Sequence, residues 1–164
     1  MVTLILSIAG CILLFLSIWG VTVTMPTGLL LANFPEDVQE KLRPRVENLP
    51  FSFKRFVGWV ILILLCTGYI ALFIIGGIDG IRNGFTFWQF FLRFFIVGVS
   101  IKVFDIVGLD YILLTKTHFF QHYFPETEGC AGWKDFGYNR KQQLRHIIMI
   151  PVGSLICALI FSVI

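Results

Sequence analysis

Charge is scarce in this sequence. Of its 164 residues, 14% are charged and 57% are hydrophobic, against about 25% and roughly 45–50% in an ordinary soluble domain. A chain of this size has too little interior to bury so many apolar side chains, so we expect the excess to face lipid. The composition excludes a disordered chain. With 13 Lys and Arg against 10 Asp and Glu, it also argues against a nucleic-acid-binding protein.

Motifs that would indicate an enzyme or a disulfide framework are absent as well. The four cysteines show no C-x-x-C spacing, and three of them fall inside apolar runs. The sequence has no glycine-rich phosphate loop, no G-x-S-x-G and no H-E-x-x-H. We therefore expect no cofactor. The N-terminal apolar stretch lacks a preceding basic region and is longer than a signal-peptide core, so we expect it to be retained as a membrane span.

Hydrophobic runs long enough to cross a bilayer occur four times. An α-helix rises about 1.5 Å per residue, so about 20 apolar residues cross a hydrocarbon core of ~30 Å. The runs cover residues 2–24, 57–77, 86–114 and 147–164, and the first stops at Met25 and Pro26. These runs predict an all-α polytopic membrane protein. It is expected to be a single domain over residues 1–164, with four transmembrane helices and two ordered cytoplasmic loops.

Basic residues in the connections predict the orientation. The long connections at residues 35–56 and 115–146 carry five Lys or Arg each, whereas the short turn at residues 79–84 carries only Arg82. The positive-inside rule then places both long loops in the cytoplasm and both termini outside it. Within the first loop, Val38 and Leu42 stand four apart among charged residues. They predict a short surface helix that ends at Arg43 and Pro44.

Four ionisable residues lie in or at the edge of the third predicted span: Arg93, Lys102, Asp105 and Asp110. Such groups cost several kcal/mol at membrane depth unless they are paired. Lys102 and Asp105 are three apart, which places them on one helix face, and Gly98 on the same stripe would let a neighbouring helix approach. Arg93 does not share that face. The pair is interpreted either as a structural lock between helices or as part of a polar conduction or substrate site.

The depth of this pair depends on where the third span begins. If the span runs over residues 85–107, Lys102 lies towards the cytoplasmic side, where its ammonium can reach the interface. If Phe85 and the aromatic residues after it form an interfacial belt, the span runs over residues 94–114 and the pair lies near the midplane. The aromatic stretch slightly favours the second register.

A second cluster follows the third span. His118 and His122 are four apart, and with Glu126 and Glu128 they have the ligand types of a divalent-metal site. The alternative, which we favour, is that these histidines contact lipid headgroups or cap a helix end, and His146 is interpreted in the same way. The glycines and aromatic residues around Trp133 predict that this loop is an ordered cap.

A short sequence recurs between the two halves of the chain. Phe34, Pro35 and Glu36 reappear as Phe124, Pro125 and Glu126, at an offset that also aligns the starts of the second and fourth predicted spans. A parallel internal repeat would explain the match. Because the chain is rich in Phe, the tripeptide can equally recur by chance.

Part of the chain resembles a group of small, uncharacterised multi-pass membrane proteins of bacteria. The resemblance covers about residues 100–145 and is carried by residues 104–105, 110–111, 116–117, 125–129 and 134–138. It implies a location in the bacterial cytoplasmic membrane and implies no activity.

Three functions follow as hypotheses. The first is a non-enzymatic accessory component that binds a membrane-protein partner or a second copy of itself. The second is a small oligomeric transporter or channel that uses Lys102 and Asp105, with Asp110 on the same route. The third is a membrane enzyme with a cytoplasmic-face site built from the His118, His122, Glu126 and Glu128 cluster. We rank them in this order, and in each the lipid bilayer is the expected surrounding.

Overall fold

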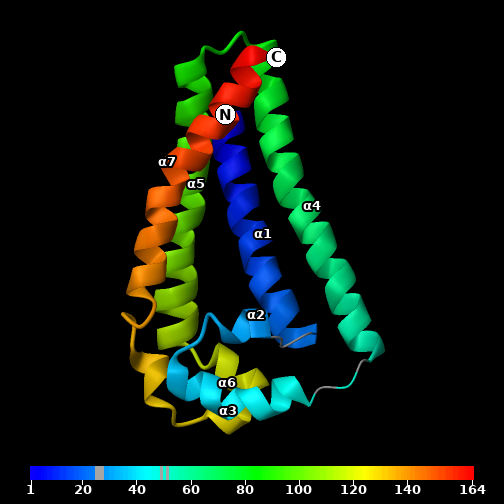
Figure 1. Cartoon of the computed structure of the whole chain (residues 1–164), viewed down its shortest axis with the longest axis vertical. Helices are drawn as coiled ribbons and strands as arrows, with labels where there is room; N and C mark the ends of the chain where they lie inside the picture. Colours follow the sequence, from blue (N-terminus) through cyan, green and yellow to red (C-terminus); the bar gives the residue numbers. More distant parts are fainter. Residues whose placement is uncertain (25–27, 49, 51) are drawn as a thin grey trace. The chain divides into compact units, whose positions relative to one another are not determined.

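The computed structural model describes residues 1–24, 28–48, 50 and 52–164. Every regular element within these ranges is helical, which confirms the all-α prediction (Figure 1). The predicted stop of the first span at Met25 and Pro26 lies outside the described residues. The elements in chain order are α1 Val2–Thr24, α2 Gly28–Leu31, α3 Glu36–Glu47, α4 Phe53–Arg82, α5 Phe87–Phe104, η1 Asp105–Lys116, α6 Phe119–Tyr123, η2 Pro125–Thr127, η3 Ala131–Lys134 and α7 Arg140–Val163.

Three helices of the described chain are long and apolar enough to cross a membrane. They are α1 with 23 residues, α4 with 30 and α7 with 24. At about 1.5 Å per residue, each exceeds the ~30 Å of a hydrocarbon core. Most of their large apolar side chains are exposed in the isolated chain, as lipid-facing side chains would be. The helices support the prediction that the protein is embedded in a membrane.

The third predicted span is divided between two kinds of helix. An α-helix, α5, covers 18 residues and ends at Phe104, and a π-helix of 12 residues, η1, continues from Asp105 to Lys116. Its wider winding is visible where the Thr117 N–H donates to the Ile112 carbonyl, 3.1 Å away and five residues back. π-Helices are rare, and most occur as single-turn bulges within α-helices, so a segment of this length is unusual. Apolar periodicity alone does not distinguish the two windings.

Helices α4 and α7 extend beyond the apolar runs that predicted them. Helix α4 includes Asp79 and Arg82, which were assigned to a turn, and α7 begins at Arg140 rather than at residue 147. The start of α7 is rich in Lys, Arg and Gln, which are good helix formers, whereas α4 continues through Asp79 and Gly80. The end of an apolar run is therefore not the end of a helix. The turn that follows α4 contains Gly84 at φ 63°, a left-handed conformation that suits glycine.

The predicted end of the first-loop helix at Pro44 is wrong. Helix α3 runs through Pro44 to Glu47. Proline removes only one helical hydrogen bond, and both the backbone N–H and the side-chain amide of Asn48 donate to the Pro44 carbonyl, at 3.3 and 2.8 Å. Val38 and Leu42 are fully buried, so the tertiary packing of α3 outweighs the local cost of the proline.

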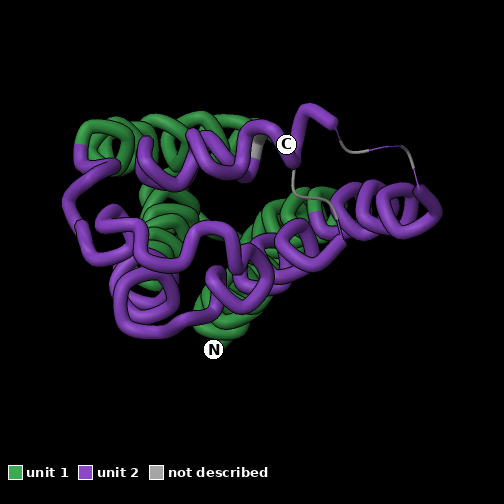
Figure 2. Tube along the Cα trace, turned by 90° about the horizontal axis from the view of Figure 1, so that it is seen from below, with its two compact units in different colours: residues 1–14, 66–105, 141–164 green, residues 15–65, 106–140 purple. Residues whose placement is uncertain are grey.

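The described chain forms two compact units (Figure 2). Unit 1 comprises residues 1–14, 66–105 and 141–164, and therefore contains parts of α1, α4 and α7 together with α5. Unit 2 comprises residues 15–65 and 106–140 and contains the segments between them. The two long predicted loops lie mainly in unit 2.

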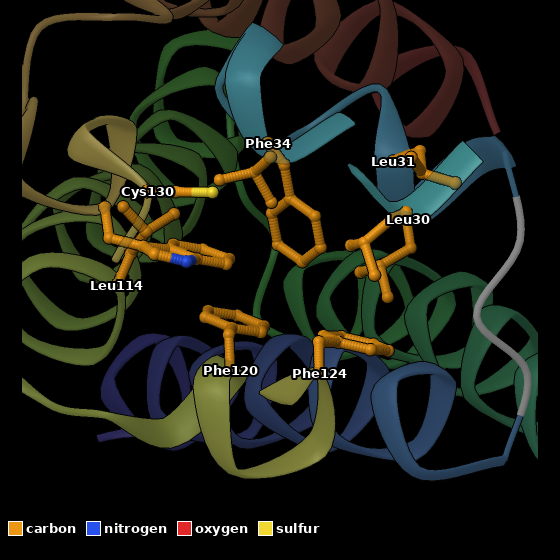
Figure 3. Packing of buried hydrophobic residues seen from close by; sticks show 10 residues of the cluster. Leu30, Leu31, Phe34, Leu114, Phe120, Phe124 and Cys130 are labelled. Carbon is orange, nitrogen blue, oxygen red and sulfur yellow. The ribbon is translucent and has the colours of Figure 1, made fainter. Parts of the chain in front are cut away.

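Aromatic packing forms the core of unit 2. The Trp133 ring stacks on Phe120 with centroids 5.6 Å apart, and Phe34 meets both rings edge-on at 5.1 and 4.9 Å. Figure 3 shows Phe34 on one side of the core, facing Phe120 and Phe124, which lie side by side on α6 and the residue that follows it. The buried members of the core are Leu30, Leu31, Phe34, Val38, Leu42, Leu114, Phe120, Phe124, Cys130 and Trp133.

Polar contacts join the two loop segments around this core. The Asp37 carboxylate accepts from the Gly132 N–H at 2.9 Å, and Arg45 pairs with Glu126 at 2.8 Å. The Trp133 indole N–H donates to the Thr127 carbonyl at 3.1 Å. These contacts and the shared core make the two loops one packed module.

Both copies of the recurring tripeptide take part in this core. Phe34 and Phe124 are buried, and their ring centroids are 6.1 Å apart. Pro35 immediately precedes α3, and Pro125 is the first residue of η2. The two copies thus play matching local roles, and the internal repeat stays a hypothesis.

Replacement of Trp133 by Ala is expected to open this core. Truncating a buried aromatic side chain costs about 3–5 kcal/mol, so the buried Cys130 thiol should react with a maleimide on the order of 100-fold faster than in the parent protein. The measurement uses a variant whose only cysteine is Cys130. Phe136→Ala is the matched control, because Phe136 is 46% exposed, and its labelling rate should stay within about threefold of the parent rate. Equal rates in the two variants would contradict the packing described here.

Candidate polar site in the helices of unit 1

Lys102 and Asp105 are in direct contact, as their spacing predicts. The Lys102 ammonium lies 2.6 Å from Asp105 Oδ2, at the junction where α5 becomes the π-helix. Lys102 is 9% exposed, and such burial disfavours an ionised group that has no partner. Pairing within one helix therefore lowers the cost of placing both charges among apolar side chains.

His146 of α7 is the third member of this site. Its Nδ1 atom lies 3.4 Å from the Lys102 ammonium nitrogen, although the two residues are far apart in the sequence. The sequence interpretation of His146 as an interfacial residue did not include this contact. A helix-to-helix contact of this kind has no local sequence signature, so only the packing of α7 against α5 reveals it.

Contacts with α1 and α4 locate the site along those helices. The Cys11 thiol lies 3.8 Å from the Ser100 carbonyl, and the Tyr69 hydroxyl donates to the Gly10 carbonyl at 3.3 Å. Gly10 and Cys11 lie near the middle of α1, and Tyr69 lies near the middle of α4. The turn of α5 that carries Lys102 is therefore level with the middle of two membrane-length helices. Which of the two predicted registers this segment takes in a membrane stays a prediction.

Close approach of α7 to α5 depends on Gly98. A Cβ atom at Gly98 would lie 2.9 Å from Ile150 Cγ2, which is closer than real Cβ atoms come. The prediction that Gly98 admits a neighbouring helix is confirmed, and that neighbour is α7. The same approach brings His146, one helical turn before Ile150, to Lys102.

Arg93 belongs to a separate charge cluster that sequence reasoning missed. It is 6% exposed, and its guanidinium pairs with Asp79 at 2.8 Å and donates to the Gly76 carbonyl at 2.6 Å. The ring of Phe85 lies beneath it, 4.2 Å from the guanidinium carbon. In the sequence, the one feature that pointed to this cluster was the presence of opposite charges, Asp79 and Arg93, on either side of one short turn. Asp79 had been assigned to that turn, and the structure places it in α4.

Asp110 belongs to unit 2, whereas both of these clusters belong to unit 1. It accepts a hydrogen bond from the Asn139 side chain at 2.9 Å, and both residues belong to unit 2. The four residues of the predicted polar site are thus distributed over three places. Lys102 and Asp105 remain together, whereas Arg93 and Asp110 each take other partners.

The four predicted metal ligands do not form a cluster. His118, His122, Glu126 and Glu128 are all exposed, and Glu126 forms the ion pair with Arg45. His122 packs edge-on against Tyr123. Among the described residues, no three or more His, Cys, Asp or Glu side chains are grouped as a metal site would require. The metal hypothesis therefore gains no support from the geometry.

Comparison with known proteins yields no family, relative or structural neighbour. No protein-family model, no curated protein and no solved structure matches the chain. The contacts described above are consequently the basis for the functional proposal.

Arg93→Gln is expected to destabilise unit 1 by leaving the Asp79 carboxylate without its partner. Removing one member of a buried ion pair costs about 3–5 kcal/mol, and because Asp79 is partly exposed we expect about 2–3 kcal/mol. Thermal unfolding in detergent micelles measures the change. Arg82→Gln is the control, because Arg82 is exposed at the end of α4, and it should change the melting temperature little.

Adding Asp79→Asn to Arg93→Gln should restore part of the lost stability, since no unpaired charge then remains. If the double variant lost as much stability as Arg93→Gln and Asp79→Asn lose together when each is made alone, the coupling between Arg93 and Asp79 would be disproved.

Proposed function

We propose that the chain is a four-span, non-enzymatic accessory component of a bacterial cytoplasmic membrane. In this proposal it binds another membrane-embedded chain, either a different protein or a second copy of itself. The binding surface is the N-terminal part of α7, residues 140–148. The bacterial location rests on the resemblance of residues 100–145.

Charge pairing supports a fourth span. Helix α5 and the π-helix η1 follow one another without a break from Phe87 to Lys116, and that length is sufficient to cross a bilayer. Arg93 and Lys102, the two basic residues of α5, each have an acidic partner within unit 1. Their pairing removes the main objection to a membrane location for this segment.

The proposal that the chain binds a partner rests on the exposure of residues 140–148. Lys141, Leu144, Arg145 and Ile148 are all exposed in the chain by itself. Yet His146, within the same stretch, contacts Lys102, which is level with the middle of α1. Exposed cations beside membrane-embedded residues are poorly suited to lipid tails, whereas a mixed basic and apolar surface suits a second protein.

Topology is the first part of the proposal to test. A cysteine at Asn83 should react with a membrane-impermeant maleimide added outside intact cells, and a cysteine at Glu128 should react only after the inner face is exposed. Both positions are exposed in the structure, so accessibility within the protein does not limit either reaction. The native cysteines are replaced beforehand. Labelling of the Asn83 position only from the cytoplasmic side would show that the orientation is inverted.

Charge reversal on α7 tests the binding surface. Crosslinking in intact membranes, followed by purification, should recover the chain joined to a second chain, and Lys141→Glu should reduce that product about tenfold or more. Lys134→Glu is the matched control, because Lys134 is also an exposed lysine and lies outside the proposed surface. Recovery of the single chain alone from the parent protein, or an equal yield from both variants, would count against this function.

A small transporter or channel is the second candidate, and one observation favours it. Lys102, Asp105 and His146 meet near the middle of α1, as groups lining a polar route through the membrane would. A chain that stays alone on crosslinking, and whose ion flux in liposomes is lost in Asp105→Asn, would favour this candidate over the accessory role. The enzyme hypothesis rests on the His118 cluster, which the described residues do not bring together.

A further inference from the structure

The contact between Lys102 and His146 constrains the protonation of the imidazole. A lysine ammonium has three donors and no acceptor. Its 3.4 Å contact with Nδ1 is therefore a hydrogen bond only when Nδ1 carries no proton, which places the proton of the neutral ring on Nε2. A proton added to Nδ1 removes the acceptor and puts a second positive charge beside Lys102.

We propose that Lys102, Asp105 and His146 form a proton-binding site that holds α7 against α5 while His146 is neutral and releases it when His146 takes up one proton. In the neutral state the Lys102 ammonium donates to both Asp105 and His146, and the three groups have no net charge. Uptake adds one proton from water to His146 Nδ1 and raises the net charge by one. Lys102 keeps its protons and Asp105 stays ionised.

His146 is the most exposed member of the site in the chain by itself. His146 is exposed, whereas the Lys102 and Asp105 side chains are 10% and 25% exposed. His146 is the member whose ordinary titration range lies between about pH 5 and 8.

The charged groups around His146 come from three elements, α5, η1 and α7. Lys102 and Asp105 act from the junction of α5 and η1, and Arg145 acts from α7 itself. Tyr69 of α4 is near enough to Asp105 for an electrostatic effect, and its hydroxyl donates to the Gly10 carbonyl. Among the charged groups named here, Asp105 is thus the one acidic group that faces the imidazole of His146. It already pairs with Lys102, so a newly protonated His146 meets two cations and one shared anion.

The proton acts where the helix winding changes. Asp105 is the first residue of η1, and its N–H is shared between the carbonyls of Ile101 and Lys102. Ile150, one turn beyond His146, packs against Gly98 on the same side of α5. Loss of the Lys102–His146 contact therefore weakens the α5–α7 contact at the end next to the π-helix and leaves the Gly98 end in place.

Histidine NMR of the single chain in lipid nanodiscs tests the site. The protein contains three histidines, and His146→Gln identifies the resonance of His146. Lys102→Gln should shift the titration midpoint of His146 by about half a pH unit or more, because a neighbouring charge is removed. The exposed His118 and His122 are internal controls, and their midpoints should not change. An unchanged His146 midpoint in Lys102→Gln would overturn the proposal.

A distance measurement tests the release of α7. Spin labels at Val99 on α5 and Ile148 on α7, both exposed positions, should show a broader distance distribution at about pH 5 than at about pH 8. His146→Gln should abolish this pH dependence, and Gly153→Ala, a substitution on α7 with open space around it, should preserve it. A distribution that does not change with pH, or that changes equally in His146→Gln, would refute the switch. Because only the isolated chain is measured, failure here leaves the partner-binding proposal intact.

Discussion

Ionised side chains in apolar surroundings need a partner, and the helices of unit 1 are arranged around that requirement. Taking a single charge out of water costs several kcal/mol even after the protein relaxes. For Arg93 this cost is offset by contacts with Asp79, the Gly76 carbonyl and the Phe85 ring. For Lys102 the cost is offset by contacts with Asp105 and His146. Each cluster requires helices to come close together, and the glycines of α4 and α5 make that approach possible.

A different force organises unit 2. Its core is a set of stacked and edge-on aromatic rings that leave water, and burial of such rings is favourable without any charge partner. The apolar side chains of α1, α4 and α7 remain exposed in the chain by itself, which is the expected arrangement for helices surrounded by lipid. The excess of Phe therefore serves aromatic packing in both units, since Phe90 and Phe94 are buried in a core of unit 1 and Phe34, Phe120 and Phe124 are buried in the core of unit 2.

The parts that sequence reasoning predicted are those with a local physical cause. An apolar run of membrane length marks a helix wherever it occurs, and a spacing of three places Lys102 next to Asp105 regardless of what surrounds them. The errors arise where packing competes with a local rule. Pro44 does not end α3, because the burial of Val38 and Leu42 stabilises the helix on both sides of it. Asp79 is helical rather than part of a turn, because an apolar boundary is not a helix boundary.

By itself, the sequence determined that this protein is helical and belongs in a membrane, because composition and apolar run length depend on no contact between distant residues. It also determined that the charged residues within the predicted spans all lie on the segment from Arg93 to Asp110. Only the tertiary structure decided which charges meet. Asp79 reaches Arg93 across a turn, and His146 reaches Lys102 from another helix. Those pairings follow from the angle and spacing at which helices pack, which no single segment of the sequence encodes.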